Sequence, residues 1–526
     1  MEKIKKYIIT GLICISLISV GYRLPKSVQS IPVDTEDIIT LNGTVFVSIG
    51  LGDFNKMTVL DNIKNEMGIK VNFNQIGNSV EESQKKYILQ LEEMPDFIMG
   101  GELKNLDILK YVMSERIIPL DELIEQYAPN IKKLLEENSF LKSACTFING
   151  KIYTLPFYNE TDSVLVDNYL FINKTWLDEL GLQIPTTTDE FYDVLCAFKT
   201  RDPNGNGKTD EIPFSYIEDI AKYSANSFIG SFGVINSDKM LMVQDKKVLF
   251  APAQEGYKEA ILYLKKLYQE GLLDTEIFTQ DIEQYIEKGR QETPVLGAFL
   301  AKDSTLIVGD ERGITDYVVV PPLKGPGGVQ LWGKRSSKII ENQFMITSKN
   351  AYPEITMAWI DKFFSQEYVQ QIAWGAEGVT IEKKGGNYKF IQPPDKKSYT
   401  EHIMENSPRG ACPGIFTQEM EGKFIFNPML SRNTLYYDQY SPYLIEDNLC
   451  RRTMFITDFM GMDKFYSSLK KYTSEMKIRW ISGEYRIEKE WERYLDALDS
   501  MGVGAYVIFY QEKYNECIQQ GEHIID

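Results

Sequence analysis

The segment Thr44-Val-Phe-Val-Ser-Ile49 is rich in β-branched residues and predicts a strand near the start of the folded chain. A helix-like stretch at residues 56–67 follows it and ends at Gly68, and apolar runs at 71–73 and 96–99 predict two further strands. Strands that alternate with helices pair in parallel through crossover helices, and ligands of such sheets bind beyond the carboxyl ends of the strands. The sequence therefore predicts an α/β protein.

The same alternation continues along the chain. Apolar residues on one face of the segment 257–270 predict a helix, and Gly271 supplies its C-terminal stop. A second helix is predicted at 353–364, and strands are predicted at 317–320 and 343–347. Folding is thus expected from about residue 40 onward.

Composition excludes several classes of function. The chain has 526 residues, of which 43% are hydrophobic and 25% are charged, as in a folded globular protein of more than one domain. The net charge of -18 would repel a phosphate backbone, so nucleic acid is not an expected partner. The only two histidines, His402 and His523, lie far apart in sequence, which argues against a histidine-based hydrolase or zinc site.

The N-terminus carries an export signature. Three lysines in residues 1–6 precede an apolar run from Tyr7 to Tyr22, which is too short to span a bilayer as an ordinary helix. Residues 1–26 are therefore predicted to be an export signal or an uncleaved membrane anchor, and polar residues 27–40 a tether. The run that ends at Gly21 is similar to a lipobox, but Tyr22 stands where the lipidated cysteine belongs. We expect the body of the protein outside the cytoplasm, either on the extracellular face of the membrane or secreted.

Cysteines predict neither a metal site nor a disulfide framework. They lack CxxC pairs and regular spacing, so buried thiols are expected, with at least one left unpaired. The five that follow the N-terminal segment are Cys145, Cys196, Cys412, Cys450 and Cys517.

The loop Arg201-Asp-Pro-Asn-Gly-Asn-Gly-Lys-Thr-Asp-Glu-Ile-Pro213 carries the pattern of a calcium site. Oxygen-bearing side chains alternate with glycines that permit a tight turn, which suits a hard cation. The first half matches the D-x-[DN]-x-[DN]-G loop, but Pro213 stands where an EF-hand has its final Glu, so the loop is a shortened one. An Asn/Gly-rich turn without an ion is the alternative. The predicted ligands of one structural calcium ion are Asp202, Asn204, Asn206, Lys208 through its carbonyl, Asp210 and Glu211.

Several motifs together resemble a known family. The run Tyr169–Leu182, followed by Pro185, Glu190-Phe191 and the loop 202–213, looks like the long extracellular solute-binding proteins, family 1, of carbohydrate ABC importers in Gram-positive bacteria, and the alginate-binding proteins are similar. The resemblance extends through further motifs over nearly the whole mature chain. These motifs are Ile118-Pro-Leu-Asp-Glu-Leu-Ile-Glu-Gln-Tyr-Ala-Pro-Asn130, Asn149-Gly-Lys-Ile-Tyr-Thr-Leu-Pro156, Trp374-Gly-Ala-Glu-Gly378, and Ile481-Ser-Gly-Glu484 through Trp491 to Tyr510-Gln511.

The resemblance implies a two-lobed, periplasmic-binding-protein-like (type II) fold with a hinge and an interlobe cleft that closes over a sugar. Lobe one is expected to contain residues 40–157 and 338–378, and lobe two residues 158–337 and 379–526. The implied function is capture of a carbohydrate, an oligosaccharide in the first place, and its delivery to ABC transporter permease subunits, without catalysis. A monomer that touches the membrane only through its N-terminal segment is expected.

Sugar recognition needs aromatic rings beside polar side chains, because sugar C–H faces stack on rings while hydroxyl groups form hydrogen bonds. Positions at loop ends and beyond strand ends are the candidates, although Asp53 can equally be a helix N-cap. The predicted ligand-binding residues are Trp332, Trp374, Glu377, Tyr158, Asp53 and Phe54. Replacing Trp332 or Trp374 by alanine is expected to weaken sugar binding by about 1–3 kcal/mol and leave the fold intact.

Two other functions stay open on the sequence alone. A secreted glycan-cleaving enzyme needs a pair of carboxylates across the scissile bond, and an acidic chain offers many such pairs. A sensor that signals through a membrane partner can use the same two-lobed fold, since fold does not decide function.

Overall fold

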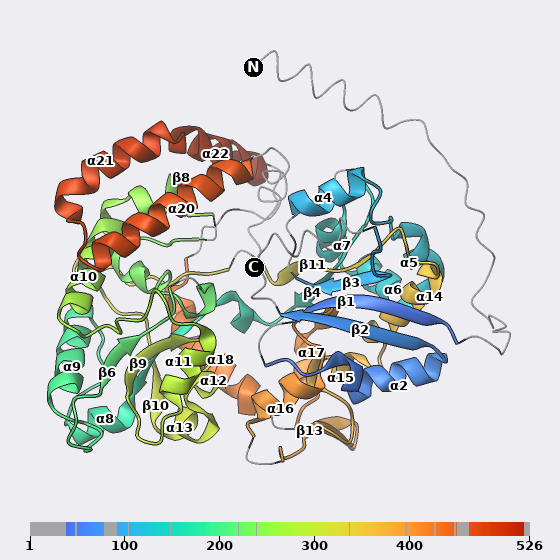
Figure 1. Cartoon of the computed structure of the whole chain (residues 1–526), viewed down its shortest axis with the longest axis horizontal. Coiled ribbons are helices and arrows are strands. Elements are labelled where there is room, and N and C mark those ends of the chain that lie inside the picture. Colours follow the sequence, from blue (N-terminus) through green and yellow to red (C-terminus); the bar gives the residue numbers. More distant parts are fainter. Residues whose placement is uncertain are drawn as a thin grey trace.

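The computed structural model describes residues 38–519, apart from 48–49, 78–91, 102, 104, 148, 219, 238, 336, 395–396, 426–427, 446–448 and 450–461. The predicted export segment 1–26 and most of the predicted tether 27–40 lie outside the described residues. The chain forms two α/β lobes, each built around its own sheet (Figure 1).

Lobe one contains a six-stranded sheet in the order β14-β4-β11-β3-β1-β2. β1 pairs in parallel with β2 and β3, and β14 pairs in parallel with β4, while β11 runs antiparallel to both β3 and β4. Five strands therefore point the same way. The strands are β1 Thr40–Val47, β2 Lys70–Gly77, β3 Phe97–Gly100, β4 Leu155–Asn159, β11 Ile339–Ile346 and β14 Gly414–Phe416.

Helices cover lobe one's sheet and bury the apolar side chains of its strands. The core brings Phe73 and Phe97 of the strands against Trp359, with ring centroids 6.0 and 5.0 Å from the indole. The other elements of this lobe are η1 Phe54–Lys56, α2 Thr58–Met67, α4 Asn105–Met113, α5 Asp121–Tyr127, α6 Pro129–Glu137, α7 Ser139–Cys145, α14 Pro353–Asp361, η6 Lys362–Phe364, α15 Val369–Trp374, the hairpin β12 Ile381–Lys384 and β13 Asn387–Phe390, α16 Tyr399–Asn406 and α17 Gln418–Gly422.

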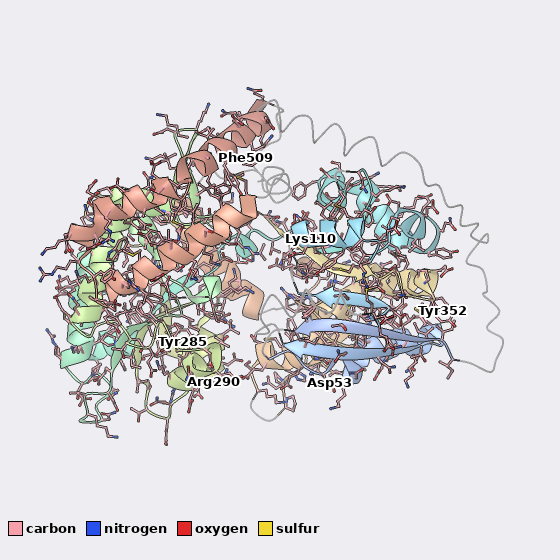
Figure 2. The ribbon with its side chains drawn as sticks, turned by 45° about the horizontal axis from the view of Figure 1, so that its top comes forward. Asp53, Lys110, Tyr285, Arg290, Tyr352 and Phe509 are labelled. Atoms are coloured by element: carbon pink, nitrogen blue, oxygen red, sulfur yellow. The ribbon has the colours of Figure 1, made fainter. Side chains whose placement is uncertain are left out.

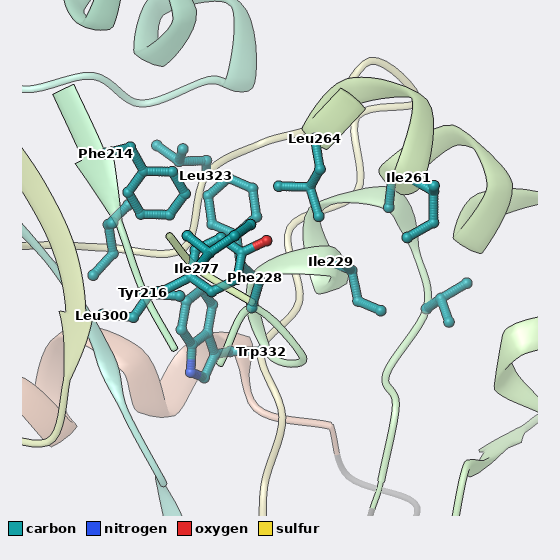
Figure 3. Close-up of a cluster of buried hydrophobic side chains, with 14 of the residues drawn as sticks. Phe214, Tyr216, Phe228, Ile229, Ile261, Leu264, Ile277, Leu300, Leu323 and Trp332 are labelled. Atoms are coloured by element: carbon teal, nitrogen blue, oxygen red, sulfur yellow. The ribbon is translucent and has the colours of Figure 1, made fainter. Parts of the chain in front are cut away.

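Lobe two contains a four-stranded sheet in the order β10-β5-β9-β6, in which β6 and β9 are the only neighbouring strands that pair in parallel. Its core joins strand residues such as Phe214 to Phe228 and Leu264 from the surrounding helices (Figure 3). The elements are β5 Tyr169–Asn173, α8 Lys174–Glu179, α9 Thr188–Thr200, β6 Ile212–Ser215, η3 Ala221–Tyr223, η4 Phe228–Phe232, the hairpin β7 Leu241–Gln244 and β8 Lys247–Phe250, η5 Ala251–Ala253, α10 Glu255–Gln269, α11 Ile282–Gly289, β9 Leu296–Ala301, α12 Ser304–Val308, α13 Asp310–Thr315 and β10 Tyr317–Val320.

The C-terminal helices belong to lobe two. The aromatic residues of α20 and α21 pack together, with Trp480 4.8 Å from Tyr494 between ring centroids, and both join the lobe-two core. Figure 1 shows the two helices against lobe two. These elements are α18 Pro428–Tyr440, η7 Ser441–Tyr443, α20 Met462–Ile481, α21 Ile487–Ser500 and α22 Val503–Gln519.

The chain passes between the lobes three times, and the third passage differs from the predicted one. The first follows β4 through η2 Asp162–Leu165, and the second lies between β10 and β11. The boundary predicted at residue 378 is wrong, because residues 381–422 pack on lobe one and β14 joins its sheet beside β4. The third passage therefore lies between α17 and α18, some fifty residues later than expected.

Local predictions from the sequence are confirmed at several elements. The helix predicted at 257–270 spans Glu255–Gln269, and Gly271 adopts a φ of 64° just beyond it. Thr187 and Glu190 form a capping box at the start of α9. Cys517 is disulfide-bonded, so the expectation of a free thiol is wrong there. Within the described ranges, no helix has the length and apolar character needed to cross a membrane.

Candidate functional site

The carboxyl ends of the parallel strands in lobe one face the chain passages. β4 ends at Asn159, where the first passage begins, and β1, β2, β3 and β14 point in the same direction. In Figure 1 the arrowheads of β1 and β2 point toward lobe two. In lobe two, β5 starts where the first passage ends, so the oppositely directed β9 and β10 end on that side, as does β6. The two carboxyl edges thus face each other, which is where an open α/β sheet binds its ligand.

A segment from α16 to β14 lies along the carboxyl edge of lobe one. The Gly52 amide donates to the Met404 carbonyl at 3.0 Å, and Gly100 at the end of β3 touches Ala411. Gly100 has a φ of 67°, and a Cβ there would lie 2.5 Å from the Phe46 carbonyl and 3.3 Å from the Ala411 Cα. Glycine is therefore needed at this position for the segment to approach the strand end.

Arg409 lies in this segment and stacks on two aromatic rings. Its guanidinium carbon is 4.7 Å from the Trp374 ring centroid and 5.3 Å from that of Phe416, the last residue of β14. Burial lowers the pKa of the Arg409 guanidinium to about 10, so the side chain stays protonated at neutral pH. The site thus contains a cation seated on an aromatic platform.

The carboxyl edge of lobe two carries a charged cluster just after β9. Asp303 caps α12 by accepting from the Thr305 amide, and its second oxygen pairs with Arg432 of α18 at 3.2 Å. Lys302 donates from Nζ to the carbonyls of Ser163 and Val166 in the first passage. Burial lowers the pKa of Lys302 to about 7.

Sequence motifs did not predict this lobe-two cluster. The available signal was the apolar run 296–301 followed by an Asp-Ser-Thr cap, which marks a strand end directly before a helix. Arg432 had no such signal, because only the folded chain brings α18 to that strand end.

Ion pairs fix the passages and join the lobes. Lys338 contacts Asp162 at 2.6 Å, linking the second passage to the first. Arg290 of lobe two contacts Glu401 of lobe one at 2.7 Å, and Figure 2 places Arg290 on the side of lobe two nearest to lobe one. In the same contact, the Tyr399 amide donates to Asp310 at 3.3 Å. The two lobes therefore touch through charged groups at the start of α16.

The two predicted tryptophans lie in different cores. Trp332 is fully buried in lobe two as part of the cluster in Figure 3, with its indole N–H donating to the Asn168 carbonyl at 3.0 Å and its ring against Tyr440. Trp374 is fully buried in lobe one among aromatic rings and the Arg409 guanidinium. Truncating a buried tryptophan to alanine leaves a cavity that costs about 3–5 kcal/mol, so the expectation that such variants keep an intact fold is inconsistent with these positions.

The other predicted ligand residues are spread along lobe one. Asp53 accepts from the Asn55 amide as the N-cap of η1, which is the alternative stated for it above. Phe54 is buried against Phe73. Tyr158 is half-buried on β4 next to the first passage, and Glu377 is exposed in the turn after α15. The structure does not gather the six residues into one cluster, and their roles in ligand binding stay predictions.

The predicted calcium loop folds as a compact turn whose polar groups converge. Asp202, with a φ of 44°, accepts from the amides of Asn206 at 3.1 Å and Gly207 at 2.9 Å. The amide side chains of Asn204 and Asn206 both donate to Asp210 at 3.1 Å. An ion at this place would need oxygens from those two side chains, which rotation of their amide groups supplies.

Glu211 is the feature of this loop that best fits a cation. Its Oε1 is buried and has no hydrogen-bond partner among the described residues. Burial, together with the nearby charges of Asp210 and Asp202, raises the pKa of Glu211. Yet within the described part of the chain, no three side chains of His, Cys, Asp or Glu are grouped closely enough to hold a metal ion. The donor set fits a hard cation, while the arrangement is that of a turn held by its own hydrogen bonds.

Two lobes, three passages and facing carboxyl edges are the arrangement of a two-lobed binding protein. The chain belongs to the bacterial extracellular solute-binding protein family, whose model matches residues 60–370. Members of this family bind solutes and are not enzymes, which confirms the expected absence of catalysis and excludes the glycan-cleaving alternative. The α/β solute-binding-protein fold is likewise confirmed.

Similar proteins cover most of the chain. The fructooligosaccharide ABC transporter substrate-binding protein FusA of Streptococcus pneumoniae serotype 4 is 29% identical over 486 residues, which is 88% of each chain. The structure of FusA in complex with kestose has a TM-score of 0.83 and 27% identity, and covers 92% of this chain and 100% of that chain. Another FusA structure with the same score is of an EF-hand mutant in complex with fructo-nystose.

More distant similarities support the fold. Alginate-binding protein AlgQ2, in a structure without calcium ion, has a TM-score of 0.73 and 21% identity, and covers 91% of this chain and 99% of that chain. Lipoprotein LipO of Bacillus subtilis is 26% identical over 321 residues, which is 59% of this chain and 61% of LipO.

Proposed function

We propose that this protein captures an oligosaccharide between its two lobes outside the cell and delivers it to the permease subunits of an ABC importer. The observation that carries the proposal is the match to FusA over 88% of both chains, because it includes both lobes and all three passages. The facing carboxyl edges supply the place for the ligand, and the buried or half-buried charges there supply hydrogen-bond donors and acceptors for sugar hydroxyls.

Fructooligosaccharides are the first sugars to test, since FusA is named for them and was solved with kestose. The purified chain from about residue 38 is mixed with kestose, nystose, neutral and acidic oligosaccharides of other linkages, and the corresponding monosaccharides. Thermal shift and calorimetry measure binding, and chromatography measures product formation. Stabilisation by one oligosaccharide class without any product is expected. No stabilisation by any sugar would contradict the proposal.

Export is part of the same proposal. The family is extracellular, and LipO is named a lipoprotein. We propose that residues 1–26 carry this chain across the membrane and either anchor it or are removed, which leaves the lobes on the outer side.

We also propose that the loop 202–211 binds one structural calcium ion. Asp202, Asn204, Asn206, Asp210 and Glu211 would offer side-chain oxygens, and Lys208 its carbonyl, at about 2.3–2.6 Å from the ion. The buried, unpartnered Oε1 of Glu211 supports this role, as does the EF-hand mutant made of FusA. The loop joins α9 to β6. Because β6 pairs in the lobe-two sheet, the ion would stabilise that lobe.

Of the six predicted ligand residues, Tyr158 is the one whose position best supports a direct contact. Its side chain is half-buried at the carboxyl end of β4, and its hydroxyl can both donate and accept a hydrogen bond. Trp332, Trp374 and Phe54 would need a change of packing before a ring face met the sugar, since protein atoms cover them.

A further inference from the structure

Arg409 is placed at the carboxyl edge of lobe one by its neighbours. Ala411 touches Gly100 at the end of β3, and Met404 accepts a hydrogen bond from the Gly52 amide in the loop after β1. Gly414 then starts β14, which pairs with the carboxyl half of β4. The residue therefore lies over the strand ends that face lobe two.

Arg409 is half-buried, and its guanidinium has no counter-charge among the described residues. Two aromatic rings, those of Trp374 and Phe416, support it at 4.7 and 5.3 Å, but no hydrogen-bond acceptor or carboxylate contacts its N–H groups among the described residues. A guanidinium has five N–H donors in a rigid fork. Within the part of the chain that the structure describes, none of the five has a protein acceptor.

The other described arginines that are partly buried, and also the exposed Arg290, have a partner for their guanidinium. Arg479 also stacks on an aromatic ring, with its guanidinium carbon 4.8 Å from the Tyr485 centroid, but it pairs with Glu475 at 2.8 Å. Arg290 and Arg432 each pair with a carboxylate, and Arg312 donates to two main-chain carbonyls. Against this background, the lack of an acceptor at Arg409 is a specific feature of the edge where a ligand is expected.

A partly desolvated cation that is left unpaired opposes folding, whereas a ligand that brings acceptors removes that cost when it binds. The aromatic platform offsets part of the cost through cation–π attraction and holds the planar group in one orientation. A fork that is fixed in advance loses little conformational freedom when it meets two adjacent oxygens. These are the properties of a recognition group and not of a stabilising one.

We propose that Arg409 is a ligand-binding residue of lobe one that donates hydrogen bonds to two adjacent oxygen atoms of the bound sugar. This inference rests on the proposed function and adds one specificity-determining residue to it. The oxygens are a pair of neighbouring hydroxyls or a carboxylate, both of which match the fork. Trp374 acts through Arg409 as a positioning residue, because its ring supports the guanidinium and is itself covered.

The test uses Arg409→Met and Arg409→Lys, with Arg479→Met as the matched control. Methionine keeps apolar contact with both rings but removes the donors and the charge, and lysine keeps the charge but not the fork. Calorimetry uses the oligosaccharide that binds the unmodified protein best in the panel described above. Affinity is expected to fall about tenfold or more for Arg409→Met, by less for Arg409→Lys, and not at all for Arg479→Met.

Melting of the sugar-free proteins gives an independent readout. Because Arg409 has no acceptor in the free protein, Arg409→Met should melt at the same temperature as the unmodified protein or higher. A merely structural arginine gives the opposite pattern, a lower melting temperature with unchanged affinity, and that result would overturn the inference. So would a Kd of Arg409→Met equal to that of the unmodified protein.

Failure of the proposed function looks different, since no sugar then binds the unmodified protein. In that case the melting temperatures of Arg409→Met and the unmodified protein still test the inference, because a lower value for the variant would contradict it. Titration at low and high salt separates the two kinds of oxygen, because a carboxylate partner loses affinity at high salt and a pair of hydroxyls does not.

Discussion

Removing calcium is predicted to loosen the loop 202–211 and to destabilise lobe two. Without an ion, the carboxylates of Asp202, Asp210 and Glu211 share one short turn, and their repulsion contributes to the raised pKa of Glu211. The perturbation is a chelator on the unmodified protein, together with the isosteric double variant Asp202→Asn, Asp210→Asn. The control is Asp245→Asn, which makes the same chemical change at an exposed turn of lobe two where φ is 50°.

The size of the effect follows from binding linkage. An ion at about 100 times its dissociation constant stabilises the folded state by about 2.7 kcal/mol. For a folding unit of roughly 250 residues, each kcal/mol moves the melting temperature by about 2–4 °C, so removal of the ion should lower it by about 5–10 °C. The hydrogen bonds that the Asn206 and Gly207 amides donate to Asp202 persist without the ion, at about 1 kcal/mol each, and should keep the loop folded.

Scanning calorimetry measures the melting temperature with chelator and after calcium is restored. The unmodified protein and Asp245→Asn should respond equally, and the double variant should not respond. Sugar affinity should be nearly unchanged in all three, because the loop joins α9 to β6 at the amino end of that strand, away from the facing carboxyl edges. A melting curve that ignores both chelator and calcium, with no metal found by elemental analysis, would show that the loop is only a turn.

Two further predictions concern the contacts between and beside the lobes. Arg290→Gln should break the pair with Glu401 and enlarge the radius of gyration of the free protein in small-angle scattering. Because both side chains are 38% exposed, the pair contributes only about 0.2–1 kcal/mol. The control Arg312→Gln loses contacts within one lobe and should leave the radius of gyration unchanged. Burial lowers the pKa of Lys302 from 10.5 to about 7, so between these pH values the unfolded chain binds more protons than the folded one. The free energy of unfolding should therefore rise with pH in that range, and Lys302→Met should lack the rise. Parallel curves of unfolding free energy against pH for the two proteins would disprove the assignment.

Helices and strands with a regular apolar period were predictable because the signal is local. The helix Glu255–Gln269 carries its buried residues at a spacing of three and four, and Gly271 provides the left-handed stop within the same window. The parallel pairing of β1 with β2 and β3 followed from the order of such elements, since a strand, a helix and a second strand in succession leave few other arrangements.

The third passage could not be predicted because nothing in its own sequence marks it. β14 is a strand of three residues, Gly414–Phe416, too short to show a period, and its partner β4 precedes it by more than two hundred residues. The boundary at residue 378, expected from the family resemblance and the strand-like segment 343–347, ended lobe one before this strand. Its placement comes from a pairing that only the folded chain contains.

The tryptophans show why a candidate site is harder to predict than a sheet. Both Trp332 and Trp374 stand next to glycine, which favours a loop end, yet residues from distant segments cover them. Tyr440 of α18 packs on Trp332, and Phe416 packs on Trp374. A loop end is exposed only if no other element lies over it, and that is a property of the tertiary structure.

The position of Arg409 is likewise a property of the tertiary structure, but here the fold brings a residue to the candidate site instead of covering it. In the sequence it is one arginine in Ser407-Pro-Arg-Gly-Ala-Cys-Pro413, without a motif that predicts binding. The fold brings that segment to the end of β3, while α15 supplies Trp374 beneath the guanidinium and β14 supplies Phe416. An aromatic ring that a sequence pattern predicts to contact the sugar, such as Trp374, can therefore act indirectly, because it holds the charged group that contacts the sugar. Free energies of unfolding and of binding in Arg409 variants distinguish a structural arginine from a ligand-binding one. A group that is unpaired until the ligand arrives strengthens binding without stabilising the free protein, so removing it weakens binding and does not lower the free energy of unfolding.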